Sequence, residues 1–520
     1  MTIEGSEVMS NPLQVPSIEK PRHILLETDS RRLTSEIRDL PYADIPSALL
    51  MAHRRLHTFN RFSLPPAKRL ELVRPFHYAF VRFTEHYRRQ FESSVFSREP
   101  NLHELDNLLE FLRELGFAFK HLIRDSLERS KRPAGLGLLL YMALNYLHHH
   151  ALFSCNRGRL LKPAFWREVH YLYFTATDLQ LELENLQTPE GKQASIEQLY
   201  KQIILIGLGS PFSLSPEEQW RAFDYVSRFG HLADISPVTD VGVLQEGYSL
   251  VRDCSQPALL PGENTAAKET VRLFNLAPFI DCLQRHMGAV KGGEALRIVG
   301  MERVQRRLVL DLLAKLHTNW TRNPERQGER QPIQENIGLV WGLESICAML
   351  DPALRRRDSL LTRPAAADNR AWADAENESP NGIRLHLGDC GQQHPDAGQV
   401  VALIRMRDEQ KILQIGLVQW CARDQNDQPF CGVQRLHGTA RKITICQQDD
   451  QNTERNGLLV VAKTADGRAR SLLMAPTGTL QPGGRVQVYS THSATPNHVE
   501  AFAVTHRTRQ VETFEIRVLQ

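Results

Sequence analysis

Cysteine, net charge and long apolar runs are all scarce in this sequence. Its eight cysteines are scattered over 520 residues, without a C-x-x-C pair or the spacing of a metal-binding finger. They are expected to be reduced thiols, most of them small buried residues. The formal net charge is only +3, which is too small for this length to argue for sequence-independent binding to DNA or an anionic membrane.

The longest apolar run, at 136–147, includes Asn145 and falls short of the roughly 20 residues that a membrane span requires. The first residues lack the basic start and apolar core of a signal peptide. We therefore predict a cytoplasmic protein without a membrane span.

Catalytic patterns are also missing from the sequence. No Ser/His/Asp, Cys/His or paired-carboxylate arrangement stands out, so we predict no catalytic residue and no enzyme activity. His148, His149 and His150 are adjacent on an expected helix and would point to different faces, which favours packing over metal binding. No metal or cofactor is expected.

The composition is that of an ordinary globular protein, with 42% hydrophobic and 24% charged residues, and the length predicts two or three domains. Residues 1–20 are expected to form a mobile tail, and residues 21–320 an all-α domain. Proline and acidic residues open several of the expected helices, and Pro75 is expected to kink or divide one of them. Further helices are predicted at 102–130, 134–153, 162–185, 192–207, 216–229, 268–286 and 294–318, with an irregular crossover at 252–268.

After Gln331 the pattern changes to short strands separated by turn residues, which predicts an antiparallel barrel. The segment after the run 337–343 could continue that strand or form a helix. Strands are expected at 383–387, 399–405, 412–422, 430–436 and 442–446, and more follow at 457–462, 470–474, 485–490, 500–506 and 512–519. The later strands exceed one small barrel, so residues 451–520 should form a second sheet or enlarge the barrel at 321–450.

Two short motifs carry the functional prediction. In the first, Arg322, Arg326 and Arg330 recur every fourth residue in a segment that contains Pro and Gly. The second is the N-x-S-x-x-G pattern of Asn377, Ser379 and Gly382, in which Ser379 to Gly382 suits a β-turn. Taken singly, the segments also fit a solvated linker and a hairpin turn. Together with the strands that follow them, they resemble the PilZ domain, a bacterial receptor module for cyclic di-GMP.

The resemblance covers roughly the last two-fifths of the chain and implies an α+β multidomain protein. Its N-terminal all-α domain would precede a C-terminal antiparallel PilZ-like β-barrel with extra strands. Arg326 and Arg330 would take the R-x-x-x-R positions, with Arg322 and Arg326 as a second possible register. Asn377, Ser379 and Gly382 would form the opposite wall of the cyclic di-GMP site. Arginines of an expected surface insertion at 351–371 could add contacts or shape another pocket.

The resulting hypothesis is a cyclic di-GMP receptor in which ligand binding at the arginine segment changes how the helical domain meets an unidentified protein partner. The alternative is a non-enzymatic scaffold whose degenerate PilZ barrel binds no nucleotide.

Overall fold

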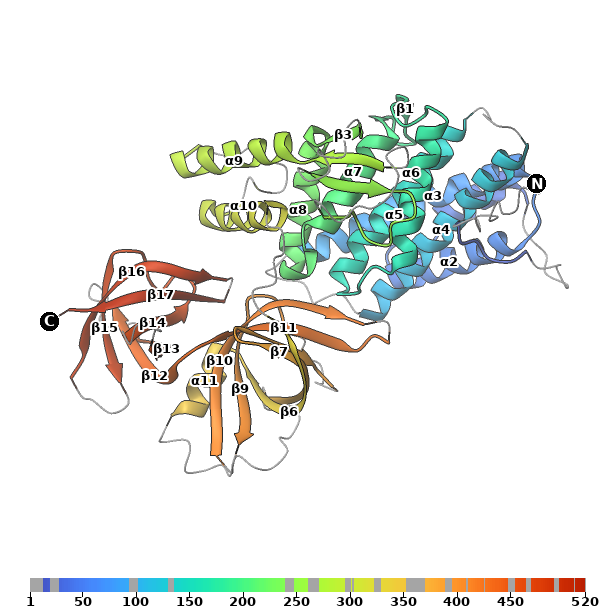
Figure 1. Cartoon of the computed structure of the whole chain (residues 1–520). Coiled ribbons are helices and arrows are strands. Elements are labelled where there is room, and N and C mark those ends of the chain that lie inside the picture. Colours follow the sequence, from blue (N-terminus) through green and yellow to red (C-terminus); the bar gives the residue numbers. More distant parts are fainter. Residues whose placement is uncertain are drawn as a thin grey trace, which may run out of the picture. The chain divides into compact units, whose positions relative to one another are not determined.

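The chain divides into two compact units, Met1–Pro211 with Pro216–Asn323, and Phe212–Ser215 with Pro324–Gln520. Figure 1 shows the computed structural model. The structure describes residues 13–18, 28–92, 102–129, 135–238, 247–260, 271–294, 301, 304–321, 329–351, 370–388, 395–407, 410–424, 426–447, 454–463, 469–490, 495–508 and 510–519. Most of the insertion expected at 351–371 and most of the tail expected at 1–20 lie outside these ranges. Within the described residues 13–18, Leu13 is buried and the Gln14 backbone N–H donates to Glu168 Oε1 at 3.3 Å, so the prediction of a mobile tail is wrong for this part.

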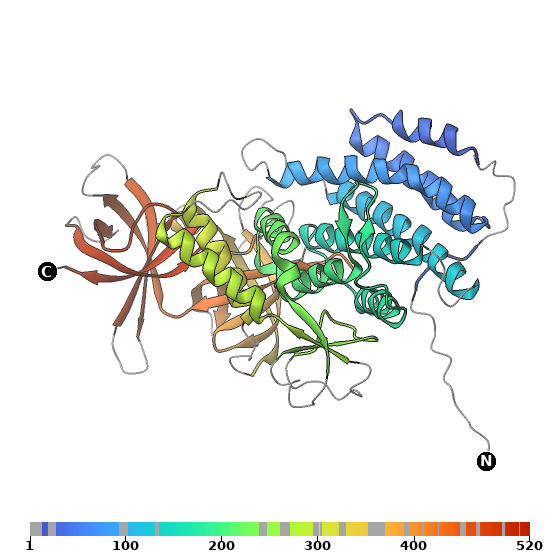
Figure 2. The same cartoon turned by 90° about the horizontal axis from the view of Figure 1, so that it is seen from above.

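Long helices make up most of the first unit, as its apolar periodicity predicts, and they pack beside one another (Figure 2). They are α1 (Ser30–Arg38), α2 (Ile45–Arg61), α3 (Pro66–Glu92), α4 (Leu102–Arg129), α5 (Leu136–Asn156), α6 (Pro163–Asp178), α7 (Ile196–Leu208), α8 (Pro216–Phe229), α9 (Ala277–Gly292) and α10 (Arg306–Thr321). Polar caps begin several of them. The Asp44 carboxylate accepts from the backbone N–H of Ser47 at α2, and the Ser195 hydroxyl accepts from that of Gln198 at α7.

Helix α5 lies at the centre of the first unit, in contact with α4, α6, α7 and α8. It is apolar on nearly all sides because it has neighbours on several faces. No helix within the described ranges is long and apolar enough to cross a membrane.

Pro75 does not divide α3, which runs without interruption from Pro66 to Glu92. Of the two outcomes expected at Pro75, a kink or a division, the division does not occur. Phe76, Phe80 and Phe83 are buried on the same side of the helix, and this tertiary packing outweighs the one backbone hydrogen bond that the proline removes.

The first unit is not all-α, which corrects the prediction from sequence. A short hairpin, β1 (Leu186–Gln187) and β2 (Gln193–Ala194), joins α6 to α7. An antiparallel sheet in the order β3-β5-β4 contains β3 (Asp234–Pro237), β4 (Tyr248–Val251) and β5 (Val271–Asn275). The helix expected at 268–286 therefore begins only at Ala277, because the preceding residues pair with both neighbouring strands.

The second unit contains two closed six-stranded barrels. The first has the strand order β10-β11-β8-β7-β6-β9. Its elements are β6 (Gln331–Trp341), α11 (Leu343–Leu350), β7 (Arg370–Ser379), β8 (Gly382–His386), β9 (Val400–Arg407), β10 (Gln410–Arg423) and β11 (Pro429–Leu436). The sequence analysis predicted strands at the positions of β8, β9, β10 and β11, and the structure confirms them. The segment after β6 is helical, which settles the alternative that the sequence left open.

The second barrel has the order β12-β13-β14-β17-β16-β15. Its strands are β12 (Thr439–Gln447), β13 (Glu454–Lys463), β14 (Ala469–Pro476), β15 (Gly484–Ser490), β16 (Asn497–Arg507) and β17 (Val511–Val518). The strand expected at 442–446 therefore belongs to this barrel, which begins before residue 450. Helix α11 packs against β12 and β13, and the Cys347 thiol donates to the Gly457 carbonyl at 3.5 Å.

Candidate functional site

The second motif lies on a tight hairpin of the first barrel. Strand β7 ends at Ser379, β8 begins at Gly382, and these two residues are strand partners. Pro380 and Asn381 form the turn between them, with proline at the position where its fixed φ is favourable. The Ser379 hydroxyl donates to the Gly382 carbonyl at 3.5 Å. This is the turn that the sequence predicts.

The first motif leads into the neighbouring strand. Gln331, the first residue of β6, pairs with Glu378, and Pro332 pairs with Asn377. Arg330 comes immediately before this pairing and is exposed. The structure therefore brings Arg330 to the same end of the barrel as Asn377, Ser379 and Gly382. Arg322 and Arg326 lie outside the described residues.

Asn377 lies beside a bulge in β7 and pairs with Arg384 of β8. The residues on either side of Arg384, Ile383 and Leu385, belong to the barrel core, so Asn377 and Arg384 share the outer face. The Asn377 Oδ1 atom is buried and has no hydrogen-bond partner among the described residues. A buried acceptor without a partner is unusual and is suited to a ligand donor.

Gly382 does not need to be glycine for the fold itself. It is absent from the residues with positive φ, and a Cβ there would meet only the Ser379 hydroxyl at 3.4 Å and the Val433 carbonyl at 3.6 Å. The fold should therefore accept Gly382→Ala, so any effect of this substitution on ligand binding would report close approach of a ligand.

A charged layer closes the barrel next to the hairpin. Val401 and Leu403 of β9 face the barrel interior, and Arg405, two residues further along the strand, faces the same way. Its Nη2 atom lies 2.7 Å from Glu378 Oε2. Arg435 likewise lies on the face of β11 that points into the barrel, and its Nη1 atom is 3.1 Å from the same carboxylate oxygen. Arg405 Nε also lies 3.5 Å from Glu335 Oε2. The layer holds opposite charges together where water is largely excluded.

Arg435 ties the hairpin to this layer. Its Nη2 atom donates to the carbonyl oxygens of Ser379 and Pro380, the latter at 2.9 Å, and its backbone N–H donates to Asn381 O at 2.9 Å. The sequence analysis did not select Arg405 or Arg435. A signal was present, because an arginine at the inward register of a strand must find buried acceptors.

Arg435→Ala should destabilise the second unit by about 2–3 kcal/mol, because it removes charge-assisted bonds from a largely buried carboxylate and two hairpin carbonyls. Amide hydrogen exchange should accelerate across the β7–β8 hairpin. Urea unfolding and exchange mass spectrometry would measure both effects. Arg441→Ala, at an exposed position of β12, controls for loss of charge. Unchanged exchange in the hairpin would contradict this role for Arg435.

Flat side chains cover the outer face next to Asn377. The Arg384 guanidinium lies 4.5 Å from the centroid of the Phe430 ring, and His386 stacks on that ring at 5.7 Å. Trp420 meets Phe430 edge to face at 5.5 Å, and its indole lies against Gly432, where a Cβ would come within 2.4 Å. Such an arginine–aromatic surface can stack a nucleobase.

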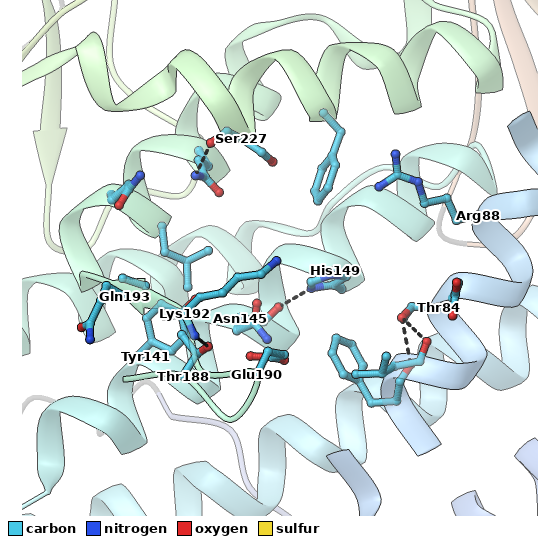
Figure 3. Close-up of a pocket in the computed structure, with 18 of the residues that line it drawn as sticks. Thr84, Arg88, Tyr141, Asn145, His149, Thr188, Glu190, Lys192, Gln193 and Ser227 are labelled. Carbon is cyan, nitrogen blue, oxygen red and sulfur yellow. Dashed lines mark hydrogen bonds between the residues drawn. The ribbon is translucent and has the colours of Figure 1, made fainter. Parts of the chain in front are cut away.

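The first unit contains a pocket of about 670 Å³, shown in Figure 3. Helices α3, α5, α7 and α8 and the β1–β2 hairpin supply its walls. They contribute Phe80, Val81, Thr84, Glu85, Arg88, Tyr141, Asn145, His149, Thr188, Glu190, Lys192, Gln193, Ala194, Ser195, Gln198, Leu199, Gln202, Trp220, Phe223 and Ser227. The size is that of a small-molecule site. The sequence analysis missed this pocket, because its lining residues are spread over five elements.

A hydrogen bond between Glu190 and His77 connects the β1–β2 hairpin, one wall of this pocket, to α3. Glu190 Oε1 lies 2.5 Å from His77 Nε2, and His77 Nδ1 lies 3.1 Å from the Tyr146 hydroxyl. The hydrogen bond from His77 lowers the pKa of Glu190 to about 2. The carboxylate is therefore ionised over the physiological range and keeps the hairpin in place.

A group with metal-ligand chemistry lies elsewhere in the first unit. Donor atoms of His53, His57 and Glu114 lie within 4.8 Å of one another. The buried Glu114 carboxylate already accepts from Asn60 Nδ2 at 2.7 Å and from Arg61 Nη1 at 3.0 and 3.2 Å. Arg61 thus balances its charge, and the arrangement is explained as a structural ion pair between α2 and α4.

Comparison with known families adds one finding. Residues 31–239 match the family model described as the N-terminal domain of the cyclic-di-GMP receptor FimW. The match covers the helices from α1 to α8, all residues that line the pocket, and none of the barrel strands. No curated protein matches the chain. The helical unit is thus similar to a domain of a cyclic di-GMP receptor.

Proposed function

We propose that this protein is a cyclic di-GMP receptor whose ligand site lies at the β7–β8 hairpin of the first barrel. The observation that carries the proposal is the pairing of β6 with β7, which brings Arg330 beside Asn377 and Ser379. Arg330 of the first motif and the residues of the second motif are thereby at one end of a closed six-stranded barrel, which supports a common ligand site there. The similarity of the helical unit to a domain of a cyclic di-GMP receptor supports the same ligand independently.

The chemistry of these residues suits the ligand. Cyclic di-GMP presents two guanine edges and two phosphodiesters, and an arginine can form paired hydrogen bonds to guanine O6 and N7, stack on a base, or hold a phosphate. Arg322, Arg326 and Arg330 take these roles in the proposal. Asn377 and Ser379 supply an amide and a hydroxyl to a base edge or phosphate, and Gly382 allows close approach.

Regulation is the second part of the proposal. In sequence, the arginine segment joins α10, the last helix of the first unit, to β6 of the barrel. A ligand that orders the arginine segment would restrict how freely α10 moves at its link to this segment. It would thereby alter how the helical unit binds a protein partner. The chain acts in this proposal by binding, without catalysis.

Isothermal titration of the full chain with cyclic di-GMP, with GTP as control, tests the proposal. Binding should be selective for cyclic di-GMP and should weaken at least 100-fold in the Arg326→Ala/Arg330→Ala variant, because two guanidinium groups that can bind guanine or phosphate are lost. Asn377→Ala should weaken it about tenfold without loss of stability, since its Oδ1 has no partner among the described residues. Arg441→Ala should bind normally.

Two results would contradict the proposal. One is the absence of binding at micromolar ligand, checked by equilibrium dialysis because the enthalpy can be near zero. The other is normal binding by the double arginine variant. The first result favours the alternative scaffold, in which the barrel binds no nucleotide and the helical unit meets its partner constitutively.

A further inference from the structure

Among the residues that the structure describes, the pocket of the helical unit contains one cation without an ion-pair partner, Lys192. Among its charged residues, Arg88 pairs with Asp224 at 2.6 Å, Glu85 pairs with Arg89, and Glu190 pairs with His77. Lys192 makes no ion pair within the described part of the chain. Figure 3 shows its side chain extending into the pocket toward His149. The lining therefore favours an anionic ligand group close to the Lys192 ammonium.

Neutral polar groups converge on the same space. The side-chain amides of Asn145 and Gln198 line the pocket, and neither has a hydrogen-bond partner within the described ranges. His149 Nδ1 lies 2.9 Å from the Asn145 carbonyl, and burial lowers the pKa of His149 to about 4. The imidazole is therefore neutral at pH 7. Its Nδ1–H donates to the Asn145 carbonyl, and its Nε2 atom remains available as an acceptor.

Aromatic rings complete the walls. Phe80 meets the His149 ring edge to face at 4.9 Å, and Phe223 lies 6.1 Å from the same ring. Trp220 packs on Phe223 at 5.7 Å, and Tyr141 lines the hairpin side. Flat apolar walls with a few converging polar groups are typical of sites for ring-bearing ligands.

We propose that this pocket binds a purine nucleotide, with the phosphate at Lys192 and the base among Phe80, His149 and Phe223. Asparagine and glutamine amides match the donor and acceptor pattern of a purine edge, and a neutral imidazole nitrogen can accept from an exocyclic amino group. The site lies within the first unit and is separate from the barrel site. The two proposals can therefore fail independently.

Equilibrium dialysis and titration of the full chain with AMP, GMP, ATP, GTP and cyclic di-GMP would test the pocket. At least one of these nucleotides should bind, and Lys192→Ala and Asn145→Ala should each weaken that binding tenfold or more. Lys162→Ala, which removes an exposed lysine at the start of α6, is the matched control and should leave binding unchanged. Circular dichroism would show that each variant is folded.

The barrel variant separates the two sites. Binding lost in Lys192→Ala but retained in Arg326→Ala/Arg330→Ala would establish the pocket, whichever nucleotide binds. Binding that is lost only in the arginine variant would overturn the pocket proposal and support the barrel site. The absence of binding by all five nucleotides at millimolar concentration would also overturn it.

Discussion

Lowering the pH from 7.5 to 5.5 should destabilise the helical unit by several kcal/mol. Burial lowers the pKa of His121, His149 and His170 to about 4 and that of His150 to about 3, and it holds the pKa of His148 well below its usual value. These histidines are neutral in the folded protein and become protonated in the unfolded chain below pH 6.5. The unfolded state then binds more protons, so stability falls as the pH falls.

Each of these groups should contribute roughly 1.4 kcal/mol for each pH unit between its unfolded and folded pKa values. Thermal unfolding followed by circular dichroism at 222 nm, which reports chiefly on helices, would measure the effect. A melting temperature of the helical unit that does not change between pH 7.5 and 5.5 would contradict it.

His148→Phe offers a test at a single residue. The His148 ring stacks on Phe223 at 4.7 Å, and its Nε2 atom is buried without a hydrogen-bond partner among the described residues. Phenylalanine retains the ring packing and removes both the unpaired nitrogen and the titration. The variant should be at least as stable at pH 7.5 and should lose less stability on acidification than the natural chain.

Lys120→Ala should cost the helical unit about 3–5 kcal/mol, because it leaves the Glu168 carboxylate buried without its countercharge. Lys120 Nζ lies 2.6 Å from Glu168 Oε1, and the two side chains are only 3% and 8% exposed. Urea denaturation would give the free energy of unfolding. The pair of Lys68 and Glu71, whose side chains are 32% and 47% exposed, is the matched control, and Lys68→Ala should cost less than about 1 kcal/mol.

The double variant Lys120→Met/Glu168→Met should recover most of the loss. Two apolar side chains of similar length need no countercharge, and replacing both partners of a buried pair is often neutral. A loss below about 1 kcal/mol in Lys120→Ala, or a double variant as unstable as the single one, would show that the pair does not act as a buried charge pair.

Local sequence patterns predicted correctly those elements in which the local conformational preference of the residues matches their tertiary packing. The alternating run after Gly382 is strand β8, and Ser379 to Gly382 forms the predicted turn, because proline and a short hairpin select that geometry locally. Val271 to Asn275 was expected in a helix and is instead strand β5, since pairing with β3 and β4 outweighs helix propensity. At Pro75 the effect is the opposite, because packing preserves a continuous helix that a local rule could have divided.

The sequence by itself determined the division into a helical and a β-rich part, the strand-forming runs and the two motifs, because period, turn residues and motif spacing are properties of neighbouring residues. Only the tertiary structure decided that β12 joins a second barrel, that Arg435 holds the Ser379 turn, and that five distant elements enclose the pocket around Lys192. These features depend on which strands pair and which helices pack. Long-range contacts of that kind follow from burial of the whole chain, which no local pattern contains.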